Sequence, residues 1–199
     1  MVERVIKNLK SRGFIAEYVQ TGEEARKRAL ELIGSASCGF GGSVTVRDLR
    51  IYDSLLENGN ELYWHWTVPD EKRNETRKKA MQADFYIASA NAVSEDGLIV
   101  NTDGTGNRTA SMFYGPRNVI IIAGVNKLVP DLEAALKRIR DIASPMNAKR
   151  LGLKTPCAKT GCSDCSSANR ICRITTIMEA PSTHTENVYV IIVGQELGY

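Results

Sequence analysis

Strand-like and helix-like segments alternate along almost the whole of this sequence, and this alternation constrains the fold more than any other feature. The apolar run NVIIIAGV (118–125) is followed, after Pro130, by LEAALKRIRDIA, which has apolar residues at helical spacing. A helix-like segment over 1–12 likewise precedes a strand-like segment over 14–19, and Thr21 with Glu24 has the spacing of a capping box at the start of the next helix. Residues 44–56 are expected to form one helix, and ITTIM (174–178) and VYVIIV (188–193) are expected as two closing strands around a turn. Strands that alternate with helices of this length are typical of a layered α/β domain with a mostly parallel sheet flanked by helices. The chain has 199 residues, 43% of them hydrophobic, so we expect one domain over residues 1–199.

Four cysteines lie close together near the end of the chain, in the pattern Cys-x4-Cys-x2-Cys-x6-Cys. They are Cys157, Cys162, Cys165 and Cys172. Inside a cell, such a cluster most commonly binds a metal, so we expect a metal-binding loop over about 155–173. The first three cysteines have the Cys-x4-Cys-x2-Cys spacing of plant-type ferredoxins, which favours an iron–sulfur cluster as the cofactor, although the fourth cysteine follows after only six residues and so departs from a ferredoxin loop. A structural zinc ion is the alternative, and a pair of disulfides is the third interpretation.

The rest of the sequence indicates a cytoplasmic protein. MVERVIKNLK is a charged, amphipathic start and not a signal peptide, and no apolar run approaches the roughly 20 residues of a membrane helix. Structural disulfides are rare in that compartment, which disfavours the third interpretation of the cluster. The fifth cysteine, Cys38, lies in a strand-like segment and is expected to behave as a small, buried apolar residue.

Positive charge is concentrated around the cysteine-rich segment. Residues 137–173 hold nine Lys or Arg against Asp141 and Asp164, a net charge of +7 within a chain whose formal charge is +3. This stretch is either a solvated surface or the binding region for an anionic ligand or an acidic partner protein. Nucleic acid is disfavoured as a partner because the stretch has no interleaved aromatic residues and matches no nucleic-acid-binding motif.

A glycine-rich turn runs from a strand-like into a helix-like segment at residues 39–45 (GFGGSVT). In a parallel sheet, ligands bind outside the carboxyl ends of the strands, and glycines there let backbone N–H groups approach an anion. We therefore expect Gly41, Gly42, Ser43 and Thr45 to bind a small anionic metabolite. The alternative for Ser43 is that it only caps the following helix.

A second polar segment, SANAVSEDGLIVNTDGTGNR (89–108), carries more amides and carboxylates than a hairpin turn needs. Paired acids beside an arginine are suited to acid–base or nucleophilic chemistry, so Glu95, Asp103 and Arg108 are the predicted catalytic residues. The predicted ligand-binding residues of the same segment are Asn91, Gly104, Gly106 and Asn107. In the alternative interpretation, Asp96-Gly97 and Asp103-Gly104 are turns without a catalytic role.

The remaining conspicuous cluster is Trp64-His65-Trp66, which more often indicates packing or an interface than a ligand site. Together with the closing strands, the two tryptophans could form a homodimer contact. His184 lies in a predicted turn, so a histidine-based catalytic triad is not expected.

Three long segments, GFGGSVTVRDL, SANAVSEDGLIVNTDGTGNRTA and GPRNVIIIAGVNKLVPDLEAALKRIRDIASPMNAKRL, resemble the LUD-domain family, which is named for lactate utilisation. The resemblance covers nearly the whole chain. It implies a fold similar to that of ribose-5-phosphate isomerase, glucosamine-phosphate deaminase and CoA transferases. Ser94-Glu95-Asp96-Gly97 is similar to the segment that carries the nucleophilic glutamate of CoA transferases, although Asp96 replaces an asparagine.

Larger members of this family work in a multi-protein system that oxidises lactate to pyruvate, some of them with iron–sulfur clusters. The resemblance therefore implies a metal-binding accessory protein of lactate or organic-acid redox metabolism, with a redox partner protein. The alternative is an enzyme acting on a CoA thioester or sugar phosphate through the Glu95 loop, with the cysteines as a structural zinc site.

Overall fold

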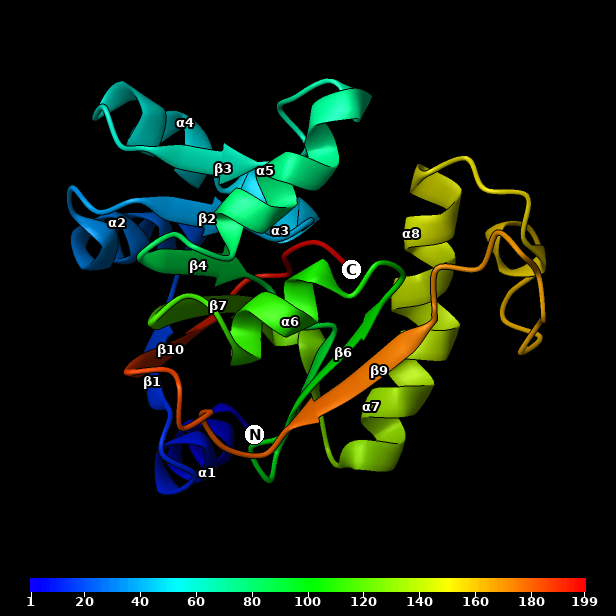
Figure 1. The fold of residues 1–199 in the computed structure, drawn as a ribbon. Coiled ribbons are helices and arrows are strands. Elements are labelled where there is room, and N and C mark those ends of the chain that lie inside the picture. The colour runs from blue at the N-terminus through cyan, green and yellow to red at the C-terminus, as the bar shows by residue number, and fades with distance from the viewer.

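Ten strands form two sheets in the computed structural model, which describes residues 1–199 (Figure 1). The larger sheet has six strands, and every neighbouring pair in it is parallel. In spatial order these strands are β1 (Ile15–Val19), β10 (Asn187–Val193), β7 (Asn118–Gly124), β4 (Phe85–Ala88), β2 (Cys38–Phe40) and β3 (Leu62–Trp64). The predicted layered α/β fold with a mostly parallel sheet is confirmed.

The smaller sheet has four strands and was not anticipated as a separate layer. Its order is β8 (Leu128–Val129), β5 (Ala92–Ser94), β6 (Ile99–Asp103) and β9 (Ile174–Met178). β5 and β6 form an antiparallel hairpin, β9 pairs antiparallel with β6, and β8 pairs parallel with β5. β5 lies inside the segment that the sequence analysis treated as a polar loop.

The two closing strands, expected as neighbours around a turn, lie in different sheets. The last four residues of β10 are all buried, and the strand lies between β1 and β7 in the larger sheet. β9 has mostly exposed or half-buried residues and lies at the edge of the smaller sheet. Their compositions explain the separation, because a strand buried on both faces needs a continuous apolar run whereas an edge strand does not.

Eight α-helices flank the sheets: α1 (Val2–Ser11), α2 (Gly22–Ile33), α3 (Val44–Asp48), α4 (Ile51–Glu57), α5 (Arg73–Ala80), α6 (Asn107–Phe113), α7 (Leu132–Arg138) and α8 (Ser144–Arg150). A π-helical turn at Ile139–Ala143 joins α7 to α8. The single helix expected over 44–56 is broken, because Arg50 adopts a left-handed conformation (φ 54°) between α3 and α4. No helix combines the length and the apolar character needed to cross a membrane.

β7 is buried on both faces, and its successive side chains alternate between two cores. Val119 and Ile121 pack with α1, α6 and the smaller sheet, whereas Ile120 and Ile122 pack on the opposite face with α2, α3 and α4. A third cluster joins the smaller sheet to α7. Because all six strands of the larger sheet are parallel, their carboxyl ends meet at one edge, where residues 41–45, 65–66, 89–91 and 125–127 follow β2, β3, β4 and β7.

Candidate functional site

A cavity of about 500 Å³ lies at this carboxyl edge of the larger sheet. Its walls come from the segments after β2, β3, β4, β6 and β7, from α5 and α8, and from the carboxyl-terminal Tyr199. Ile171, from the cysteine-rich segment, also lines it. This is the volume and position expected of a small-molecule site in a parallel α/β protein.

The cavity wall carries a strong excess of positive charge. Its cationic side chains are those of Arg73, Arg77, Arg108, Lys127 and Arg150. The only acidic residue in the wall is Asp103, which forms an ion pair with one of these cations. The remaining four cations have no counter-charge within the wall, so the cavity is suited to an anionic ligand.

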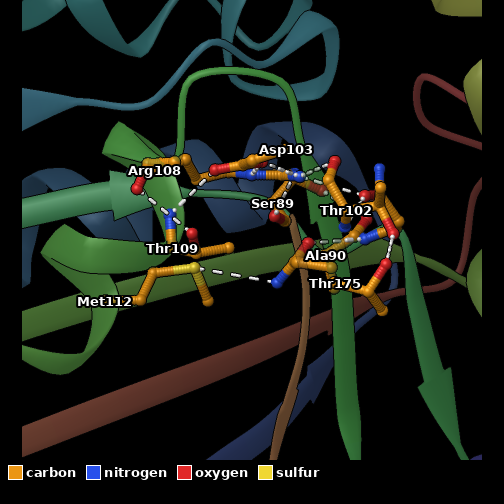
Figure 2. A network of polar contacts seen from close by, with 11 residues as sticks. Ser89, Ala90, Thr102, Asp103, Arg108, Thr109, Met112 and Thr175 are labelled. Carbon is orange, nitrogen blue, oxygen red and sulfur yellow. Dashed lines mark hydrogen bonds and ion pairs between the residues drawn. The ribbon is translucent and has the colours of Figure 1, made fainter. Parts of the chain in front are cut away.

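The Asp103–Arg108 ion pair is buried, with side-chain exposures of 9% and 10% (Figure 2). Nε and Nη2 of Arg108 donate to the same Asp103 oxygen, Oδ1, at 2.8 and 2.6 Å. The other oxygen, Oδ2, accepts from the backbone N–H of Thr109 at 3.0 Å. Both carboxylate oxygens of Asp103 therefore already have donors from the protein.

Arg108 also joins the ends of three strands. Its Nη1 donates to the carbonyl of Ser89 after β4, and its Nη2 donates to Asn91 Oδ1 before β5 and to the carbonyl of Thr102 in β6. These donor–acceptor distances are 3.3, 2.9 and 3.0 Å. Arg108 thus holds the floor of the cavity together, and the two predicted catalytic residues Asp103 and Arg108 are brought into direct contact.

Lys127 is almost completely buried, at 3% exposure, yet it contacts no carboxylate. Its Nζ donates to Thr45 Oγ1 and to Ser89 Oγ, each at 2.8 Å. Burial, and to a smaller extent the positive charges of Arg138 and Arg108, lower the pKa of Lys127 from 10.5 to about 7. Near neutral pH this side chain is therefore divided between an ammonium and a neutral amine.

The depressed pKa of Lys127 predicts that stability rises with pH. Between about pH 7 and 10.5 the unfolded chain holds a proton on Lys127 that the folded protein lacks, so the free energy of unfolding increases with pH in this window. Relative to Lys127→Met, the wild-type protein should gain up to about 1.4 kcal/mol per pH unit. Urea unfolding of both proteins at about pH 8 and about pH 9.5 measures this difference. A constant difference across this window would show that Lys127 is not desolvated.

Arg73 and Arg77 extend from one face of α5 to the cavity, one helical turn apart. The Nε atoms of both are buried and have no hydrogen-bond partner, although Arg73 Nη1 forms an ion pair with Asp70 at 2.9 Å. Beside them, burial, and to a smaller extent the positive charges of Arg77 and Arg73, lower the pKa of His65 to about 4, so the imidazole is neutral near pH 7. The unpartnered Nε donors on a positive wall are what a bound anion would satisfy.

Trp66 and Arg150 form the wall nearest to α8. The Arg150 guanidinium lies 4.8 Å from the centroid of the Trp66 ring, and Trp64 stacks on Trp66 at 5.2 Å. Arg150 Nε donates to Tyr199 Oη at 2.9 Å. Trp64 packs in the core, as expected, whereas His65 and Trp66 line the cavity, a position that the sequence analysis did not assign to them.

Most of the predicted ligand-binding residues lie in the wall of this cavity, and they are Gly42, Ser43, Thr45, Asn91, Gly104 and Asn107. Gly41 lies behind the wall, where a Cβ would meet Ala88 and Arg108 at 3.2 and 3.3 Å. Gly106, with φ 85°, is the N-cap residue that precedes α6. Ser43 Oγ accepts from the N–H of Val46 at 3.2 Å, which is the capping role that was weighed as its alternative.

Glu95 does not line the cavity. It lies in the turn of the β5–β6 hairpin, at the end of β6 opposite to Asp103, and its carboxylate pairs with Arg4 at 2.7 Å. Ser94 bonds to Asp96 and Gly97 has φ 86°, so this segment has the turn chemistry of the alternative interpretation. A catalytic role for Glu95 stays a prediction, and Glu95 is separate from the cavity.

The four clustered cysteines are free thiols in an extended loop. Arg170 organises part of it by donating to the carbonyls of Cys165 and Cys172, at 2.7 and 3.1 Å. No group of three or more His, Cys, Asp or Glu side chains is arranged to hold a metal ion. The donor set suits an iron–sulfur cluster or zinc, but the thiols do not converge in this conformation. Cys38 is buried as expected, and burial raises the pKa of its thiol.

The cations Arg73, Arg77, Lys127 and Arg150 were missed as site residues by the sequence analysis. Lys127 follows the carboxyl end of the apolar strand β7, which is where a parallel sheet places its ligands. Arg73 and Arg77 are spaced i, i+4 and so share a helix face. Those two signals were available from the sequence, whereas Arg150 depends on how α8 packs.

Comparisons with known proteins identify the kind of domain that carries this site. A family model described as the LUD domain matches residues 2–193. Among solved structures, a DUF162 family protein from Deinococcus radiodurans is similar, with a TM-score of 0.59 and 13% sequence identity. The similarity covers 97% of this chain and 96% of that protein. No curated protein matches the sequence.

Proposed function

Because this chain belongs to the LUD-domain family, we propose that it acts in lactate-related organic-acid metabolism by binding a small anionic metabolite in the cation-lined cavity. The resemblance found in the sequence is confirmed over residues 2–193. The observation that carries the proposal is the imbalance of charge in the wall, where five cations face one carboxylate that already belongs to an ion pair.

The geometry of the cavity favours a metabolite that has at least one carboxylate or phosphate group. Arginine guanidinium groups bind such anions through charge-assisted hydrogen bonds, each contributing about 1.5–3 kcal/mol. Arg73 and Arg77 come from α5 and Arg150 from α8, so two helices supply arginines to the cavity wall. The hydroxyl and amide groups of Thr45, Ser89 and Asn91 lie across the floor and are suited to fixing the orientation of the ligand.

A small anion should stabilise the protein against heat. A ligand at about 100 times its dissociation constant adds about 2.7 kcal/mol, and each kcal/mol raises the melting temperature of a protein of this size by about 2–4 °C. The measurement is a thermal-shift screen with lactate, pyruvate, inorganic phosphate, a CoA thioester and a sugar phosphate. The proposal predicts a shift with at least one of these compounds, and failure of all of them at high concentration would contradict it.

We also propose that the cysteine-rich loop binds an iron–sulfur cluster, or zinc as the alternative. Residues 159–173 contain no helix or strand, and none of them is buried. A loop this long without structure of its own is uncommon in a small domain and is usually functional. Metal binding would require the loop to close and bring its thiols together. An iron–sulfur cluster, when bound, would supply electron transfer to a redox partner protein.

Metal analysis of protein purified without oxygen tests this second proposal. Iron with sulfide, or zinc, should be present in the wild-type protein and greatly reduced in Cys165→Ser. Ser166→Ala is the matched control, since it changes the neighbouring residue of the same loop without removing a thiolate, and it should keep the metal. Equal metal content in all three proteins, or none in any, would contradict metal binding by these cysteines.

A further inference from the structure

We propose that Lys127 is a catalytic amine, which forms an imine with the carbonyl carbon of a small oxo acid bound in the cavity. This inference rests on the proposed function, since it requires an anionic metabolite in the same cavity. It assigns a chemical role to a lysine that is buried without a counter-ion and that lines the cavity wall.

The hydrogen bonds around Lys127 orient its nitrogen. The two hydroxyl groups that contact Nζ can direct their own hydrogens to backbone carbonyls, because Thr45 Oγ1 lies 3.2 Å from the oxygen of Leu197 and Ser89 Oγ lies 3.4 Å from that of Ala90. Both hydroxyl oxygens are then acceptors for Lys127. A neutral amine has two N–H bonds and one lone pair. With both N–H bonds donated to these oxygens, the lone pair is left for the cavity.

The charges around Lys127 favour this neutral amine. Arg108 and Arg138 are the charged groups that act on it, and both are cationic. Arg138 is bonded to the backbone carbonyls of Asn126 and Asn91, and the carboxylate of Asp103 is taken by Arg108. His65, which also lines the wall, is neutral above its pKa of about 4. Burial and these cations bring the pKa of Lys127 to about 7, in the range that catalytic lysines require.

The cavity also indicates the class of carbonyl compound. Arg73, Arg77 and Arg150 are suited to binding a carboxylate, which would place the adjoining carbonyl group toward the floor where Lys127 lies. The lone pair of Nζ forms the C–N bond, and the carbonyl oxygen takes a proton from the nitrogen. This oxygen then leaves as water after taking a second proton from solvent, so that the nitrogen is left as a protonated imine.

Reductive trapping with pyruvate as the probe tests the inference. Borohydride transfers a hydride to the carbon of a protonated imine, which converts it into a stable secondary amine that peptide mass spectrometry locates. We expect the adduct on Lys127 to be at least about tenfold more abundant than on the exposed Lys149, because Lys149 lies outside the cavity that would hold the oxo acid beside the amine. Trapping at Lys127 should increase with pH through a midpoint near its pKa of about 7.

Lys127→Arg keeps a positively charged side chain at this position and removes the nucleophile. The variant should therefore lose the specific adduct, and its remaining lysines should show only the background level. The melting temperature of the variant shows whether it is folded, and the site of labelling in the wild-type protein tests the inference without any variant. Labelling of Lys149 equal to that of Lys127 would overturn it. Pyruvate that stabilises the protein without giving an adduct would overturn it too, while leaving anion binding intact. Failure of every anion to bind would overturn both proposals.

Discussion

Replacement of Arg108 by methionine is expected to destabilise the protein by about 3–5 kcal/mol, because it leaves the buried carboxylate of Asp103 without its counter-ion. The substitution also removes the donors to the Ser89 and Thr102 carbonyls and to the Asn91 side chain, which join the ends of β4, β5 and β6. The free energy of unfolding from urea denaturation measures the loss. This change should affect stability more than any other substitution of a charged residue discussed here.

Arg117→Met is the matched control for this prediction. Arg117 pairs with Glu186 at 2.7 Å, but both side chains are more than half exposed, so the loss should not exceed about 1 kcal/mol. The double variant Asp103→Asn, Arg108→Met should recover part of the stability, since the uncompensated charge is then gone. Equal losses for the Arg108 and Arg117 variants would show that the Asp103–Arg108 pair is hydrated and does not support the cavity floor.

Replacement of Arg77 by glutamine is expected to weaken the binding of the anionic metabolite by about 10–100-fold. The loss of one charge-assisted hydrogen bond costs about 1.5–3 kcal/mol, and each 1.4 kcal/mol corresponds to a factor of ten in the dissociation constant. Arg77 is chosen because its Nε is buried and unpartnered and no ion pair holds its side chain. Calorimetric titration with the anion that gives the largest thermal shift measures the effect.

Lys78→Gln is the control, because it removes the same charge from the next residue of α5 on an exposed side chain outside the cavity. Its effect on the dissociation constant should be small and should disappear as salt is added, since only long-range attraction is lost. If both variants weakened binding equally, a contact between Arg77 and the ligand would be contradicted.

The local structure that the sequence predicted correctly depends on short-range chemistry. Thr21 caps α2 by accepting from the N–H of Glu24 at 3.2 Å, as the capping pattern indicated. Glu24, however, bonds back to the N–H of Gln20. The helix break at Arg50 was missed because the apolar spacing continues from Val46 across it to Leu55, and both of those residues are buried.

The candidate site was only partly predictable because its charges come from distant parts of the chain. The segments that supply Asp103 and Arg108 are adjacent in sequence, and their polar composition was visible there. Lys127 lies at the carboxyl end of an apolar strand, which the sequence indicates, whereas Arg150 reaches the cavity only through the packing of α8. The separation of Glu95 from Asp103 follows from β6, because Glu95 lies in the turn before this strand and Asp103 is its last residue, so the two lie at opposite ends of the strand.

The cysteine-rich loop contacts the wall of the cavity. Ile171 lines the cavity and lies against Gly104. A Cβ on Gly104 would lie 3.2 Å from the carbonyl oxygen of Ile171. The N–H of Arg173 donates to the carbonyl of Asp103 at 3.0 Å. The cysteine-rich loop therefore contacts the cavity wall at Ile171, just before β9 begins. The two proposed binding regions are adjacent in the structure.

The most direct test of the anion-binding cavity is a crystal structure of the protein with the anion that gives the largest thermal shift. We predict electron density for the anion inside the cavity, with its charged group within hydrogen-bond distance of Arg77 and of Arg73 or Arg150. Density for the anion at another surface, with this cavity filled only by water, would contradict the central claim.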